Sequence, residues 1–82
     1  MQESRPPSVT ILGAGAWGTT LALIADRAGA SVTLMPHRRE DASRMATTRR
    51  HPRSLPGIVI PDAITIAQPD AVAQAPDLLV IA

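Results

Sequence analysis

The sequence predicts an α/β fold built on a parallel sheet, and two observations lead to this prediction. Short apolar or β-branched runs alternate with segments of helical periodicity, a pattern typical of right-handed βαβ units. A glycine-rich turn from Gly13 to Gly18 joins the first run to the first helical segment. If the sheet is doubly wound, its strand order is 3-2-1-4.

The first strand and the first helix flank this turn. Ser8–Leu12 is a β-branched run that ends in glycine, as expected of a strand buried on both faces of a sheet. From Ala16 to about Ala28, apolar side chains recur every three or four residues, and Gly29 lies where a helix would end. The predicted apolar face of this helix consists of Trp17, Leu21, Ile24 and Ala28.

A second strand and a weaker helix follow. Ser31–Met35 returns to strand character, and Pro36 closes it because proline cannot donate to a ladder. Glu40–Arg50 is predicted as a helix, with acidic residues in the first turn and arginines in the last turn, as the helix dipole favours. Prolines and a glycine make residues 51–62 an irregular connection, in which Ile58–Ile60 is a candidate for a brief extended piece.

The rest of the chain predicts a third strand, a short helix and a fourth strand, at Ala63–Ala67, Asp70–Ala75 and Asp77–Ala82. The fourth strand is the most apolar segment, and in the predicted order it lies on an open edge that no following helix covers. Either another chain covers this edge or residues 8–82 are a truncated N-terminal part of a larger domain, and we favour the truncation. Residues 1–7 are expected to form a short disordered lead.

Composition argues against several classes of function. The net charge is +1 and the eight basic residues are all arginine, so no dense basic surface for nucleic acid is expected. There is no cysteine, and His37 and His51 lack companion ligands at metal spacing, so no metal site is predicted. No segment has the length and apolar character of a membrane span or a secretory signal, which favours a cytoplasmic protein.

The glycine-rich turn has the G-x-G-x-x-G pattern of dinucleotide-binding proteins, with a strand before it and a helix after it. Gly13 allows the tight turn, Gly15 lets the backbone approach a pyrophosphate, and Gly18 lets the helix pack close to the strand. Unpaired amides at the helix N-terminus then bind phosphate. The sequence therefore predicts the N-terminal half of a Rossmann-type sheet, in the order βαβαβαβ, that binds NAD or NADP. The alternative is a glycine-rich turn without a ligand.

The residues after the second strand bear on the choice of cofactor. An NAD site usually has an acidic residue there, whereas this chain has His37, Arg38 and Arg39. Arginine suits a ribose 2′-phosphate because its guanidinium makes bidentate bonds, so NADP is at least tolerated. The alternative is an exposed turn. The ring of Trp17 must pack inward or overhang the binding cleft, and we favour the cleft.

Three segments together resemble the N-terminal domain of the NAD(P)-dependent glycerol-3-phosphate dehydrogenases. They are VTILGAGAWGTTLAL at Val9–Leu23, the residues Ser31–Arg39, and HPRSLPGIVIP at His51–Pro61. In that family, the residues before the last glycine and those after the second strand contact the cofactor. The contacts that the resemblance implies here are Ala16, Trp17, His37 and Arg38.

The resemblance implies hydride transfer between NAD(P)H and dihydroxyacetone phosphate, which makes glycerol 3-phosphate for phospholipid synthesis. It is compatible with a full-length protein that binds this small phosphorylated substrate and forms a homodimer. The lysine and the helical substrate domain of the family lie beyond Ala82, so no catalytic residue is predicted within the chain. His51, Ser54 and Met35 depart from the residues usual in the family.

Three other functions stay open. Another dehydrogenase with the same fingerprint, such as a ketopantoate reductase or a hydroxyacid dehydrogenase, is disfavoured by the segment HPRSLPGIVIP. A non-catalytic NAD(P)-binding module is compatible with the length of the chain. An FAD site generally needs an acidic residue after the second strand, where this chain has arginines.

Overall fold

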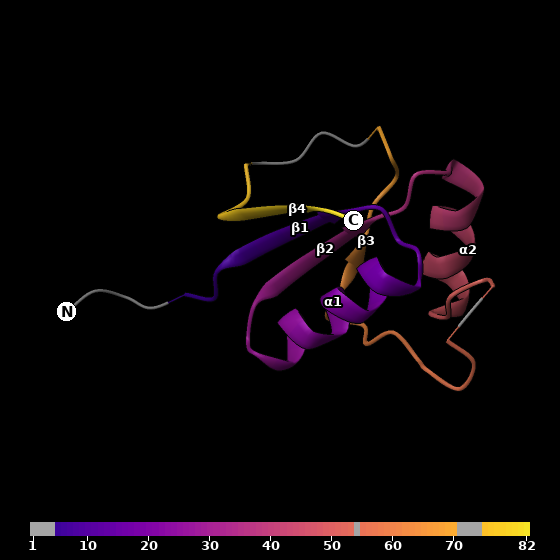
Figure 1. Ribbon diagram of the computed structural model, residues 1–82, viewed down its shortest axis with the longest axis horizontal. Coiled ribbons are helices and arrows are strands. Elements are labelled where there is room, and N and C mark those ends of the chain that lie inside the picture. The colour runs from indigo at the N-terminus through magenta and orange to yellow at the C-terminus, as the bar shows by residue number, and fades with distance from the viewer. Residues whose placement is uncertain (1–4, 54, 71–74) are drawn as a thin grey trace.

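The structure is a computed structural model that describes residues 5–53, 55–70 and 75–82. Its elements are β1 (Ser8–Leu12), α1 (Ala16–Arg27), β2 (Ser31–Met35), α2 (Arg39–Thr48), β3 (Thr65–Ile66) and β4 (Leu78–Ile81). All strand pairs are parallel, and the strand order is β3-β2-β1-β4 (Figure 1). The predicted α/β class and strand order are therefore confirmed.

The carboxyl ends of three strands meet at one edge of the sheet. Leu12 at the end of β1 is level with Met35 of β2 and Ile81 of β4. The amide of Gly13 donates to the Met35 carbonyl oxygen at 2.9 Å, and the amide of Ala82 donates to the Leu12 carbonyl oxygen at 2.9 Å. The turn after β1 is therefore held between the ends of its two neighbouring strands.

The core lies between the sheet and the two helices. Figure 1 shows α1 packed along β1 and β2 and α2 beside β3, in agreement with the contacts between these elements. The fully buried apolar side chains are Ile11, Ala22, Val32, Leu34, Ala42, Met45, Ile60 and Ile64. Two of these, Ile60 and Ile64, come from the connection before β3, so this irregular segment is part of the core.

The predicted apolar face of α1 is wrong for Trp17, Ile24 and Ala28, whereas Leu21 packs against the core. Trp17 and Ile24 are 67% and 57% exposed, and Ala28 is also exposed. The residues buried in α1 are instead Gly18, Thr19 and Ala22. Because these side chains are small, the helix axis lies close to the sheet, and the larger Leu21 and Leu23 are only partly buried against the core.

The predicted arginine-rich last turn of α2 is also wrong, because the helix ends at Thr48 and its C-cap is Arg49. Arg49 adopts a left-handed conformation with φ 58°. Its guanidinium donates to the carbonyl oxygens of Ile60 (3.3 Å), Pro61 (2.5 Å) and Ile64 (2.5 Å). Arg49 therefore leaves the helix and fastens the segment 60–64 to its end.

The later strands are shorter than predicted. The third strand was predicted at Ala63–Ala67 but covers only Thr65–Ile66, because the Ile64 amide closes a turn on Pro61. No strand forms at Ile58–Ile60, where only Ile60 is buried. The short helix predicted at 70–75 falls largely outside the described residues, as do residues 1–4 of the predicted lead.

Strand β4 forms the open edge that the sequence predicts. Three of its apolar side chains, Leu78, Leu79 and Ile81, are between 51% and 76% exposed. Asp77, predicted as its first residue, precedes the strand and accepts a hydrogen bond from the Ser8 amide at 2.8 Å. Among the described residues, no helix has the length and apolar character needed to cross a membrane.

Gly18 determines how closely α1 approaches the turn after β1. A Cβ atom at this position would overlap the carbonyl oxygen of Gly13, and it would also lie 3.3 Å from the Ala82 side chain. Both the backbone of the turn and the end of β4 are fixed by hydrogen bonds, so neither can move aside freely.

We predict that Gly18→Ala destabilises the fold by about 3 kcal/mol, the upper part of the range for overpacking of a close contact. Thermal unfolding followed by circular dichroism measures this change. The matched control is Gly15→Ala, since a Cβ at Gly15 would meet nothing within 4 Å. Equal melting temperatures for the two variants would contradict the role given to Gly18.

Candidate cofactor site at the glycine-rich turn

Gly13 is required by the fold. Its φ is 101°, in the region that favours glycine, and a Cβ there would overlap the carbonyl oxygen of Ala82. The same Cβ would lie 2.9 Å from Nε2 of His37. The imidazole of His37 therefore lies against the turn.

Gly15 differs from the other two glycines of the motif because the fold does not require it. Its φ of −70° and ψ of −173° are extended values that any residue adopts. A Cβ at this position would have nothing within 4 Å, and the residue is exposed. The space above Gly15 is open to a ligand.

The amino end of α1 faces the same space. Gly15 is its N-cap and provides no side-chain capping bond, and the first turn contains no acidic residue. Ala16 and Trp17 are both exposed there. Amides of this first turn together with the positive end of the helix dipole form a site suited to an anion.

Two of the predicted residues after β2 share a pocket with the glycine-rich turn. His37 and Arg38 are exposed, and both line a pocket of about 200 Å³. The full described lining is Ala14, Gly15, Pro36, His37, Arg38, Asp41 and Arg53. Gly13 and Gly18 are buried beside it, whereas Ala16 and Trp17 are not among its described lining residues.

Arg39 takes no part in this pocket. Its guanidinium donates to the carboxylate of Asp70 at 2.6 Å, and both side chains are largely exposed. Among the described residues, Arg38 makes no such ion pair. Of the two neighbouring arginines, Arg38 is therefore the one available to a ligand in the pocket.

Two charged lining residues were missed from the sequence. Arg53 donates from two guanidinium nitrogens to the two carboxylate oxygens of Asp41, at 2.8 and 3.2 Å. The hydrogen bond and the charge of Arg53 lower the pKa of the Asp41 carboxyl below its ordinary value. No local pattern predicts this ion pair. Asp41 lies in the first turn of α2, and Arg53 lies 12 residues further along the chain, in the loop after the helix.

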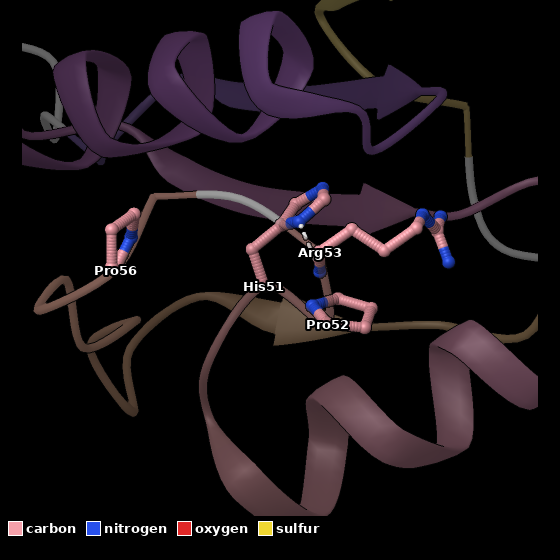
Figure 2. Close-up of a pocket in the computed structure, with 4 residues that line it drawn as sticks. All are labelled: His51, Pro52, Arg53 and Pro56. Atoms are coloured by element: carbon pink, nitrogen blue, oxygen red, sulfur yellow. Dashed lines mark hydrogen bonds between the residues drawn. The ribbon is translucent and has the colours of Figure 1, made fainter.

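His51 joins this segment to the glycine-rich turn. Its Nδ1 accepts from the Arg53 amide at 3.1 Å, so its Nε2 carries the proton and donates to the Ala14 carbonyl oxygen at 2.9 Å. Figure 2 shows His51, Pro52 and Arg53 on the loop after α2, where they and Pro56 line a further pocket of about 270 Å³. Within the described residues, no group of three His, Asp or Glu side chains is placed to hold a metal.

Comparison with known proteins gives a consistent result. Residues 8–82 match the family described as NAD-dependent glycerol-3-phosphate dehydrogenase N-terminus. A glycerol-3-phosphate dehydrogenase (NAD(P)+) of Bradyrhizobium diazoefficiens is 49% identical over 75 residues, which cover 92% of this chain and 23% of the relative. The protein of the same name from Prosthecochloris aestuarii is 44% identical over 75 residues, which cover 90% of this chain and 23% of the relative.

A solved structure agrees with these relatives. The crystal structure of glycerol-3-phosphate dehydrogenase from Coxiella burnetii matches with a TM-score of 0.67 and 33% sequence identity. The match covers 73% of this chain and 18% of that one. The chain thus spans about a quarter of the length of the curated relatives, whose names include the cofactor class that the sequence predicts.

The Asp41–Arg53 pair predicts a pH dependence of stability. Because folding lowers the pKa of Asp41, the ionised carboxylate stabilises the fold above its ordinary pKa of 3.8, and this contribution is lost as the pH falls through the lower folded value. We expect Asp41→Asn to lower the melting temperature near pH 7, and the difference from the unmodified chain to vanish as the pH falls well below 3.8.

Melting curves at a series of pH values measure this dependence. Glu40→Gln is the control, since it removes the same charge from an exposed neighbouring position. A constant difference between Asp41→Asn and the unmodified chain down to the lowest pH would contradict the assignment.

Proposed function

Because the chain belongs to the N-terminal family of the NAD-dependent glycerol-3-phosphate dehydrogenases, we propose that its glycine-rich turn binds the pyrophosphate of NAD(P). The pyrophosphate lies over Gly15 and accepts hydrogen bonds from amides of the first turn of α1. The adenosine extends towards His37 and Arg38 at the end of β2.

The observation that supports this proposal most directly is the environment of Gly15. Gly13 and Gly18 are explained by backbone conformation and packing, but neither explanation applies to Gly15, whose missing side chain leaves open space. A phosphate that approaches the backbone there accounts for the absence of a side chain. The open space at Gly15 supports binding of a ligand over this residue.

The charge of the neighbouring pocket bears on which dinucleotide binds. Arg38 lines it without an ion-pair partner among the described residues, and no acidic residue follows β2 directly. A guanidinium forms charge-assisted, bidentate bonds with the 2′-phosphate of NADP. It does not repel the neutral ribose hydroxyl that NAD has at the same position. We propose that the site accepts both NAD and NADP and favours NADP through Arg38.

We propose that the protein takes part in the interconversion of dihydroxyacetone phosphate and sn-glycerol 3-phosphate, for glycerophospholipid synthesis. The dinucleotide would supply the hydride, and the residues of this chain would bind and orient it. A cytoplasmic location and a homodimeric assembly are part of the proposal and are compatible with the family.

The first test of this function is direct binding of NADPH. Trp17 is the single tryptophan of the chain and is 67% exposed beside the turn, so quenching of its fluorescence reports an occupied site. We predict that Gly15→Val weakens binding at least roughly tenfold, because its methyl groups occupy the space of the pyrophosphate. Circular dichroism should show an unchanged fold.

Ala46→Val is the matched control, since it introduces the same valine side chain at an exposed position of α2. A Gly15→Val chain that binds NADPH as tightly as this control would overturn the proposed site.

The second test separates the two cofactors. We predict that Arg38→Gln weakens NADPH binding about tenfold and leaves NADH binding nearly unchanged, because only NADPH has the 2′-phosphate. Titration calorimetry of both cofactors measures the two affinities. Equal losses for NADPH and NADH would refute the assignment of Arg38 to the 2′-phosphate.

A further inference from the structure

The loop after α2 is fastened to both sides of the pocket that contains Arg38. On one side, His51 donates to the carbonyl oxygen of Ala14 in the glycine-rich turn, at 2.9 Å. On the other side, Arg53 makes its two bonds to Asp41 in the first turn of α2. The loop thereby forms a third wall of the pocket, and Figure 2 shows the Arg53 side chain extending away from Pro56 towards the end of β2.

The balance of charge in this pocket depends on Arg53. Two guanidinium groups and one carboxylate line it, which leaves one positive charge when His37 is neutral. Without Arg53, the charges of Arg38 and Asp41 would cancel, and the carboxylate would face the pocket without its partner. A dianionic ligand would then meet no net attraction.

Pairing with Asp41 leaves Arg53 able to bind a further anion. A guanidinium has five N–H donors, and the two contacts to the carboxylate use one hydrogen on each of two nitrogens. Among the residues that the structure describes, the remaining donors make no other hydrogen bond, while the bidentate pair fixes the orientation of the group. Asp41 therefore holds Arg53 in place and at the same time reduces the positive potential of the pocket.

We propose that Arg53 is a second specificity-determining residue for the 2′-phosphate of NADP(H), and that Asp41 limits the preference for NADP(H) by its negative charge. This inference rests on the proposed function of the site. It assigns the recognition of the 2′-phosphate to two segments, the turn after β2 and the loop after α2. The adenosine phosphate would lie between Arg38 and Arg53.

The test compares the affinities of the chain for NADPH and NADH, by quenching of Trp17, in four variants. They are Arg53→Gln, Asp41→Asn, the double variant Asp41→Asn/Arg53→Gln, and the control Arg50→Gln, which removes an exposed arginine of the same loop that is not among the described lining residues. We expect Arg53→Gln to lower the preference for NADPH about tenfold and Asp41→Asn to raise it. The double variant should recover most of the loss, and Arg50→Gln should change nothing.

Two results would overturn this inference alone. One is that Arg53→Gln weakens both cofactors equally. The other is that Asp41→Asn lowers the preference for NADPH as Arg53→Gln does. The Asp41–Arg53 pair would then have only a structural role. A folded chain that binds neither cofactor would overturn the proposed function as well.

A second measurement covers the case in which a variant fails to fold. Residues 8–82 replace the matching segment of the Bradyrhizobium diazoefficiens dehydrogenase, and the ratio of the KM values for NADPH and NADH is compared across the same variants. The expected changes in this ratio have the same directions, and an unchanged ratio in Arg53→Gln contradicts the proposal.

Discussion

The close approach of α1 to the turn after β1 is the constraint on which the rest of the structure depends. It requires a glycine at position 18, because a side chain there would overlap the Gly13 carbonyl oxygen. With the helix this near the sheet, its unpaired first-turn amides face the edge where the ends of β1, β2 and β4 meet. The close packing at Gly18 thus brings together the N-terminus of α1, the open space above Gly15 and the His37 side chain.

The second half of the site depends on how the loop after α2 returns to the sheet. Arg49 ends the helix in a left-handed conformation and bonds three carbonyl oxygens between residues 60 and 64. This arrangement buries Ile60 and Ile64. It also brings the residues that follow Arg49 back to the glycine-rich turn. His51 and Arg53 then contact the turn and α2 respectively. A connection without regular secondary structure therefore contributes both to the core and to the wall of the pocket.

The sequence was sufficient for the fold class, the strand order and the position of the glycine-rich turn, because each follows from local pattern and the rules of parallel sheets. It failed where tertiary packing overrides such patterns. The apolar spacing of Trp17 and Ile24 suggested an inward face, yet the residues of α1 that are fully buried are the small Gly18, Thr19 and Ala22. The sequence predicted Arg49 in the last turn of the helix, where the helix dipole favours a positive charge. In the structure, its guanidinium instead donates to carbonyl oxygens 11 to 15 residues away. The pairing of Asp41 with Arg53 could not be predicted for the same reason.

The central claim is that a dinucleotide binds with its pyrophosphate over Gly15 at the amino end of α1. The most direct measurement is a titration of the isotope-labelled chain with NADPH, followed through the amide resonances in nuclear magnetic resonance. We predict that the amides of residues 13–18 shift first and most, together with those of His37, Arg38 and Arg53. Saturating shifts confined to other parts of the chain, such as the exposed edge of β4, would contradict the claim.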